Sequence, residues 1–320
     1  MNSKKLLCCL TGLCLGLFSL LAQARSEDCR KSLRPETAFV EIPSIDLGAQ
    51  PPAPLVVKGK LSLPLRFDRR KRCFVVGTAL PAVVILHGSA GVDSRGDFYA
   101  RGLNAAGVAT LEIDMWEARG VTGPQNRPRA PILTFADAFA ALGYLSAHPN
   151  VAPGRIGVLG FSWGGVVSLA AAETLYATNF GKGLHFAAHV ANYPVCYGAN
   201  AVIPGLPPPA EFGSQLLHLT GAPVLIQIGS EDDYDNGAGH CRTLADGLNG
   251  SNNNVVQVTE YPGAYHAWDR LMIPVTAQDP FGNEGSYFRS GVIPTVRIAP
   301  DVDQAYASRR RVVEFFRRKL

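Results

Sequence analysis

One pentapeptide in this chain has the residue types and the spacing of a serine nucleophile. Residues 160–164 read Gly-Phe-Ser-Trp-Gly, between an apolar segment at 155–159 and an Ala-rich segment at 166–173. A Gly-x-Ser-x-Gly sequence between a strand and a helix is typical of a nucleophile elbow, a sharp turn that exposes the serine hydroxyl. Glycines suit this turn because they have no Cβ to collide with its backbone. A glycine turn with an idle serine is the alternative, but the flanking segments favour a catalytic Ser162.

A serine hydroxyl reacts when a base takes its proton and an acid holds that base in the correct tautomer. In enzymes with such an elbow, the acid follows the serine and the histidine comes last. Of the seven histidines, only His240 and His266 follow Asp232. His240 begins a predicted helix eight positions after that acid, whereas His266 follows a predicted strand. We expect His266 to be the general base and acid; a surface loop histidine is the alternative.

The acid should leave the strand that precedes this histidine. Four acidic residues crowd the exit of the predicted strand 223–228, namely Glu231, Asp232, Asp233 and Asp235. Asp232 is the fourth residue of a Gly-x-x-Asp sequence that starts at Gly229, so a turn there would direct its carboxylate toward His266. We expect Asp232 to be the acid. Asp233 and Asp235 remain alternatives, as do solvated turn carboxylates without a catalytic role.

A tetrahedral intermediate also needs backbone N–H donors for its oxyanion. The residue after the nucleophile normally supplies one, and the loop after an earlier strand supplies the other. We expect these donors to be the amides of Trp163 and of Ser89, with Ala90 as the alternative to Ser89. His87 comes too early in the chain for the base, so we expect it to brace the loop after its strand.

The elements that must position these residues alternate between strands and helices. Apolar segments predict strands at 81–88, 108–113, 155–159, 185–192, 223–228 and 254–260. Helical patterns lie at 98–106, 135–147, 162–176, 241–248 and 303–318. This alternation predicts an α/β fold with a doubly wound, mainly parallel sheet flanked by helices. An alternating segment at 55–67 suits an edge strand, whereas 272–300 and a Pro-rich loop at 204–212 have no regular pattern.

The N-terminus has the features of a signal peptide. Lys4 and Lys5 precede an apolar run from 6 to 21, and Ala22-Gln23-Ala24 is a small-residue cleavage signal. The run is short for a membrane span. We therefore expect an exported protein, periplasmic or secreted, after cleavage near Ala24. The expected organisation is a signal peptide at 1–24, an arm at 25–54 with one short strand near 38–42, and one catalytic domain at 55–320.

Four cysteines remain after this cleavage, and an even number in an exported protein suggests disulfides. Of the three possible pairings we prefer Cys29–Cys73, which would tie the arm to the domain, and Cys196–Cys241, which would brace loops near the site. No Cys-x-x-Cys is present, so a zinc site is not expected.

The charge of the chain does not indicate a nucleic-acid partner. The formal charge is +4 and falls to about +2 without Lys4 and Lys5, which gives no reason to expect a nucleic-acid partner. The basic clusters at 69–72 and 309–311 are expected to be solvated surface. No stretch beyond the signal peptide is apolar enough for a stable membrane anchor.

Taken together, these motifs resemble the dienelactone hydrolase family within the α/β-hydrolase fold. The resemblance is carried by residues 87–91, 114–120, 137–145, 155–165, 229–233 and 261–268. It implies a hydrolase without a cofactor, with a triad at Ser162, Asp232 and His266. Dienelactone hydrolases proper use cysteine as the nucleophile, so the serine favours a carboxylesterase-like member.

We therefore expect an exported serine hydrolase that cleaves small carboxylic esters or lactones through an acyl-enzyme. The alternatives are a peptidase of the same fold and a non-catalytic binding protein on a hydrolase scaffold. Five aromatic residues either line an apolar pocket around the serine or pack in the core: Trp116, Trp163, Tyr193, Tyr197 and Trp268. Arg119 would receive a substrate carboxylate or, as we favour, pair with an acid of the protein.

Overall fold

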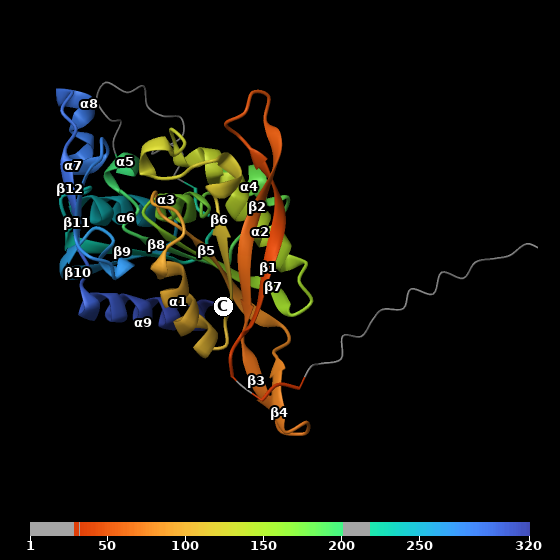
Figure 1. Ribbon diagram of the computed structural model, residues 1–320. Coiled ribbons are helices and arrows are strands. Elements are labelled where there is room, and N and C mark those ends of the chain that lie inside the picture. Colours follow the sequence, from red (N-terminus) through yellow and green to blue (C-terminus); the bar gives the residue numbers. More distant parts are fainter. Residues whose placement is uncertain (1–28, 32, 201–217) are drawn as a thin grey trace, which may run out of the picture.

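A sheet of eight strands forms the frame of the molecule (Figure 1). The structure is a computed structural model and describes residues 29–31, 33–200 and 218–320. The strand order is β1 (Glu36–Asp46), β2 (Ala53–Leu63), β6 (Ala109–Asp114), β5 (Leu80–Leu86), β7 (Val151–Phe161), β8 (Ala188–Asn192), β9 (Val224–Glu231) and β10 (Val256–Tyr265). All neighbours from β6 to β10 are parallel, and β2 is antiparallel to both β1 and β6.

The apolar strand segments are explained by helices on both faces of this sheet. In β5, Val83 and Ile85 pack on one face with α1 (Ser94–Ala105) and α9 (Val302–Lys319). Val84 and Leu86 pack on the other face with α2 (Phe135–Ser146), α3 (Trp163–Ala170) and α4 (Thr174–Gly181). Because successive side chains of a strand point to opposite faces, a strand covered on both sides must be apolar throughout. The predicted α/β fold is confirmed.

The prediction of one long helix at 162–176 is wrong, because two helices occupy this segment. Helix α3 ends at Ala170, and α4 begins at Thr174. Between them, Glu173 is extended and pairs with Leu219, while its carboxylate accepts from the backbone N–H of His218 at 3.0 Å. A partner segment 45 residues away therefore interrupts the helix, which local helix propensity does not reveal.

The N-terminal arm belongs to the sheet. Its strand β1 is longer than the predicted segment 38–42 and pairs with β2 over its whole length. Strand β1 is therefore the edge, and the prediction that 55–67 forms an edge strand is wrong. The last part of that segment belongs to β3 (Leu65–Asp68), which pairs with β4 (Cys73–Val76) in a separate small sheet.

The segment 272–300 is not irregular. It contains the antiparallel pair β11 (Val275–Gln278) and β12 (Thr295–Ile298), with the short helices α7 (Gly282–Gly285) and α8 (Tyr287–Ser290) between them. Figure 1 shows these elements in blue beside β9 and β10. Helix α6 (Gly239–Ser251) connects β9 to β10, and α5 (Tyr197–Asn200) follows β8. The predicted loop at 204–212 and the predicted signal peptide lie outside the described residues.

Both predicted disulfides are present. Cys29 is bonded to Cys73 at the start of β4, and Cys196 is bonded to Cys241 in α6. Within the described residues, no helix combines the length and the apolar character that crossing a membrane would require.

Candidate active site

Ser162 lies on a strained turn between β7 and α3. Its backbone has φ 51° and ψ −109°, a conformation that side-chain-bearing residues rarely adopt and that often marks functional sites. The turn is so tight that a Cβ on Gly160 would lie 1.8 Å from the carbonyl oxygen of Gly164, and a Cβ on Gly164 would lie 2.4 Å from that of Leu86. The glycine spacing of the motif is thus a steric requirement of this turn.

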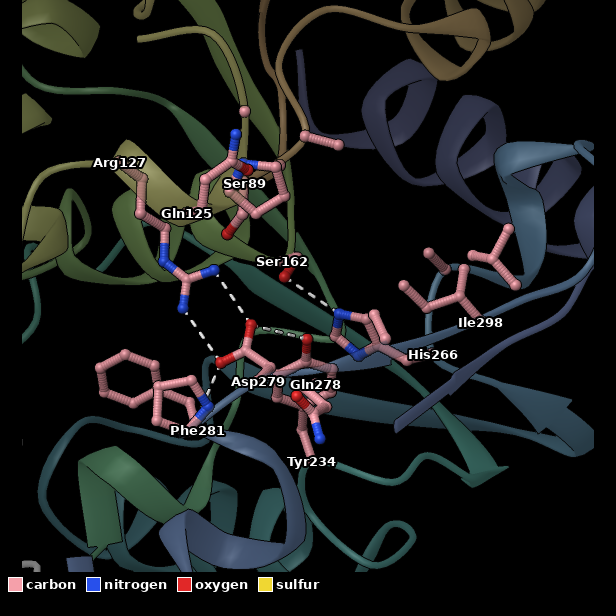
Figure 2. Close-up of a pocket in the computed structure, with 18 of the residues that line it drawn as sticks. Ser89, Gln125, Arg127, Ser162, Tyr234, His266, Gln278, Asp279, Phe281 and Ile298 are labelled. Carbon is pink, nitrogen blue, oxygen red and sulfur yellow. Dashed lines mark hydrogen bonds and ion pairs between the residues drawn. The ribbon is translucent and has the colours of Figure 1, made fainter. Parts of the chain in front are cut away.

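Three side chains that are distant in sequence meet in one hydrogen-bonded line. The Nε2 atom of His266 lies 3.0 Å from the Oγ of Ser162 (Figure 2), and its Nδ1 lies 2.8 Å from the Oδ2 of Asp232. His266 is 3% exposed and Asp232 is 1% exposed. The residues follow the carboxyl ends of β7, β9 and β10, which is the edge where open α/β sheets hold their ligands.

The other two candidate acids have different partners. The oxygens of Asp235 accept the backbone N–H groups of Cys196 and Tyr197, each at 2.7 Å. Burial, with a contribution from the nearby charge of Asp232, raises the pKa of Asp235 to about 7. Asp233 accepts the backbone N–H of Arg297 at 2.5 Å. Asp232 is therefore the one of the three whose carboxylate is hydrogen-bonded to the imidazole.

The predicted oxyanion donors border the space in front of Ser162. Trp163 is the first residue of α3, where backbone N–H groups have no partner within the helix. Its indole Nε1 donates to the Oγ1 of Thr134 at 3.0 Å, which fixes the orientation of the indole ring. Ser89 and Ala90 line the same cavity as Ser162, on a turn that the hydrogen bond from Gly91 N to Gly88 O closes at 3.0 Å.

His87 and Arg119 stabilise loops around the site. The Nε2 of His87 accepts the backbone N–H of Met115 at 2.9 Å, so its ring joins the loop after β5 to the loop after β6. The guanidinium of Arg119 donates to both oxygens of the buried Asp137, at 2.6 and 3.2 Å. The interpretations of His87 as a brace and of Arg119 as the partner of an acid agree with these contacts.

A cavity of about 790 Å³ opens in front of Ser162 and His266. Its walls come from residues 122–129, which follow β6, and from the 272–300 segment, including Gln278, Asp279 and Phe281 (Figure 2). Most of the aromatic residues that we considered as its lining pack in the core instead. Trp116, Tyr193, Tyr197 and Trp268 are almost fully buried and line none of the cavities at Ser162, whereas Trp163 lines a smaller one.

Sequence reasoning missed an ion pair that borders the same cavity as Ser162. The guanidinium of Arg127 donates to both oxygens of Asp279, at 2.9 and 3.0 Å (Figure 2). Tyr234 donates its hydroxyl to the same carboxylate at 3.1 Å, and the backbone N–H of Phe281 does so at 3.0 Å. Burial opposes ionisation of Asp279, but Arg127 outweighs it and lowers the pKa of the carboxyl. Arg127 and Asp279 are 152 residues apart, and no local sequence pattern indicates that they form a pair.

Two tyrosine rings pack against the imidazole of His266. The ring of Tyr234 lies 4.2 Å from that of His266 and the ring of Tyr193 lies 4.7 Å from it, between centroids. Tyr193 donates its hydroxyl to the buried Asp269 at 2.5 Å, and Tyr99 donates to the same carboxylate at 2.7 Å. These contacts restrict the rotation of His266.

Within the described residues, one cluster has potential metal ligands close together, namely Cys196, Asp235 and Cys241. The two cysteines form a disulfide and offer no thiolate. The line of Ser162, His266 and Asp232 contains no cluster of this kind.

The sheet order, the elbow and the positions of these residues define an α/β-hydrolase fold. Solved structures with this fold resemble the chain over most of its length. A dienelactone hydrolase-like promiscuous phosphotriesterase from metagenomic libraries matches with a TM-score of 0.53 and 19% identity, covering 88% of this chain and 98% of that one. A thermophilic carboxylesterase from a metagenomic library matches with a TM-score of 0.56 and 17% identity, covering 89% of each. An esterase from the archaeon Pyrobaculum calidifontis matches with a TM-score of 0.55 and 16% identity, covering 88% and 85%.

The family is established by sequence. The profile of the dienelactone hydrolase family matches residues 75–278, which is more than half of the chain. This chain belongs to the dienelactone hydrolase family and is a carboxylic ester hydrolase. A search of curated protein sequences found no match.

Proposed function

We propose that this enzyme cleaves small carboxylic esters or lactones through an acyl-enzyme on Ser162. The serine Oγ attacks the substrate carbonyl carbon while His266 Nε2 takes the hydroxyl proton. Asp232 keeps the other imidazole proton on Nδ1 and stabilises the imidazolium that forms. Collapse of the tetrahedral intermediate breaks the ester bond, and the leaving alcohol takes the proton from Nε2. Water, activated by the same histidine, then releases the acid and restores the serine.

The carbonyl oxygen becomes negatively charged during both steps. We propose that the backbone amides of Trp163 and Ser89, or of Ala90 in place of Ser89, donate to it. The positions of these amides support the proposal, because Trp163 begins a helix and Ser89 and Ala90 lie on a turn that borders the cavity of Ser162. Loss of one such donor typically costs about 10²–10³ in rate.

The observation that carries this proposal is the unbroken line of contacts at 3.0 and 2.8 Å from Ser162 through His266 to Asp232. Ser162 and His266 border a cavity large enough for a small molecule. A binding protein on the same scaffold would not require this line, which therefore supports a catalytic role for Ser162, His266 and Asp232.

The test is the hydrolysis of short p-nitrophenyl esters by the purified protein, with Ser162→Ala and His266→Ala as inactive variants. A fluorophosphonate probe should label the native protein on Ser162 and leave Ser162→Ala unlabelled. Activity that survives Ser162→Ala would refute the mechanism. Absence of both turnover and label would favour the binding scaffold, and cleavage of peptides in preference to esters would favour the peptidase.

We also propose that the enzyme is exported and that residues 1–24 are its signal peptide. Two disulfides support this proposal, because such bonds persist mainly in oxidising compartments. The expected partner is a small ester or lactone. We expect no nucleic-acid partner, no stable membrane anchor and no cofactor. N-terminal sequencing of the protein from cells that express the full chain should find Arg25 as the first residue. A retained residue 1 would contradict the proposal.

A further inference from the structure

Two cavities of very different size meet at Ser162. The large one has about 790 Å³, and a small one beside it has about 60 Å³. Both are bordered by Ser162 and by a common set of residues, which are Ser89, Arg127, Tyr234, Asp279 and Phe281. The lining that belongs to the small cavity alone is apolar and consists of Pro131, Trp163, Val166 and Val195. We call these two spaces the large chamber and the small chamber.

His266 borders the large chamber and does not line the small one. In the proposed reaction, the leaving oxygen must take its proton from Nε2 of this histidine, so it must lie on the histidine side of the carbonyl carbon. The large chamber is therefore the side that the alcohol occupies. The side bordered by Trp163, away from the imidazole, is left for the acyl chain.

We infer that the enzyme selects esters of short acyl groups with large, polar alcohols. This inference rests on the proposed function and specifies its substrate class. The small chamber has about 60 Å³ against about 790 Å³ for the large one, so it suits a short acyl group. The large chamber presents polar side chains, including Gln125, Gln278 and Arg270, which suit an alcohol that carries hydrogen-bonding groups.

An ion pair fixes two of the residues that border both chambers. Arg127 and Asp279 border both spaces, as Ser162 does, and their two hydrogen bonds join residues 122–129 to the 272–300 segment (Figure 2). The lowered pKa of Asp279 keeps this pair charged at neutral pH. An acyl chain that displaced Arg127 from Asp279 would break a buried ion pair, which is costly.

Two valines line the small chamber and not the large one. Val166 lies in α3, one turn after the nucleophile. Val195 has φ 57°, which is strained for a β-branched residue and which glycine adopts without strain. Val166→Ala and Val195→Gly should both enlarge the chamber, and the second should also relax the backbone. Ile298 lines the large chamber and does not line the small one, so Ile298→Ala is the matched control.

The test measures kcat/KM for p-nitrophenyl acetate, butyrate and octanoate, which share one alcohol. The wild-type enzyme should prefer the two shorter esters to octanoate by at least about tenfold, since a single methylene in a confined pocket changes rates by about 10–200-fold. Val166→Ala and Val195→Gly should raise the octanoate-to-acetate ratio by about tenfold or more. Ile298→Ala should leave this ratio within about twofold of the wild type. Thermal melting shows that each variant is folded.

Equal turnover of octanoate and acetate by the wild type would overturn the inference. So would a ratio that changes in Ile298→Ala and not in the two valine variants, since the acyl chain would then occupy the large chamber. These results leave the proposed function intact. Absence of turnover on every ester, with no fluorophosphonate label on Ser162, would instead reject the proposed function.

Discussion

Replacement of Asp232 by asparagine should inactivate the enzyme without disturbing its shape. The structure determines how the new amide would be oriented. The Oδ1 of Asp232 accepts the backbone N–H of Tyr234 at 2.9 Å, and the Oδ2 faces the Nδ1 of His266 at 2.8 Å. The amide oxygen of asparagine would keep the first contact, so its NH₂ group would face Nδ1.

That orientation reverses the tautomer of the imidazole. Nδ1 must then accept a hydrogen bond, and the ring proton moves to Nε2, the atom 3.0 Å from the Ser162 hydroxyl. A protonated Nε2 cannot take the serine proton. The same replacement in serine proteases lowers kcat about 10⁴-fold, which corresponds to about 5 kcal/mol of transition-state stabilisation. We expect a loss of this size in kcat for Asp232→Asn.

The assay is p-nitrophenyl acetate hydrolysis at pH 8, with thermal melting to show that the variant is folded. Asp233→Asn is the matched control, because it makes the same chemical change one residue away. Asp233 accepts the backbone N–H of Arg297, which the amide oxygen of asparagine can also accept. This variant should keep kcat within about threefold of the wild type.

Two results would refute the reasoning. If folded Asp232→Asn keeps more than a tenth of the wild-type kcat, the carboxylate does not control the tautomer of His266. If Asp233→Asn loses as much activity as Asp232→Asn, the loss reflects damage to the whole strand exit and not the role of one acid.

Other predictions concern the frame of the site. Gly160→Ala would bring its Cβ to 1.8 Å from the Gly164 carbonyl oxygen, so we expect a destabilisation above about 4 kcal/mol in urea unfolding; a fully stable variant would contradict the steric argument. Removal of the Cys196–Cys241 disulfide by Cys241→Ser opens a loop closed over 45 residues and should cost about 4 kcal/mol in the chain-entropy relation, measured against the oxidised protein. Asp235 binds its proton more tightly in the folded state, with a pKa of about 7, so its contribution to stability is present below its unfolded pKa and is lost as pH rises to 7. Asp235→Asn should therefore weaken the fall in melting temperature between pH 4 and 7, and an unchanged pH profile would exclude this role.

Much of the fold could be predicted from the sequence because it depends on local patterns of apolar residues and glycines. Apolar runs such as the one in β5 indicated strands buried on both faces, and their alternation with helices indicated a parallel sheet. The order of serine, acid and histidine selected Ser162 and His266, and a Gly-x-x-Asp turn favoured Asp232. The turn exists, with the N–H of Asp232 directed at the Gly229 carbonyl at 3.4 Å.

The errors occurred where distant segments override local preference. The Ala-rich helix after Ser162 is interrupted because Glu173 pairs with Leu219. The segment at 55–67 is not an edge because the arm supplies β1. The irregular composition of 272–300 concealed the β11 and β12 pair.

The sequence by itself determined the strained serine turn, the type of sheet and the residues that could form the proton relay, because each depends on residue type and on order along the chain. Only the tertiary structure decided which carboxylate reaches the imidazole of His266. It also paired Arg127 with Asp279 at the cavity in front of Ser162. The physical reason is that hydrogen bonds and ion pairs act over about 3 Å, and folding alone determines which residues of a long chain come that close.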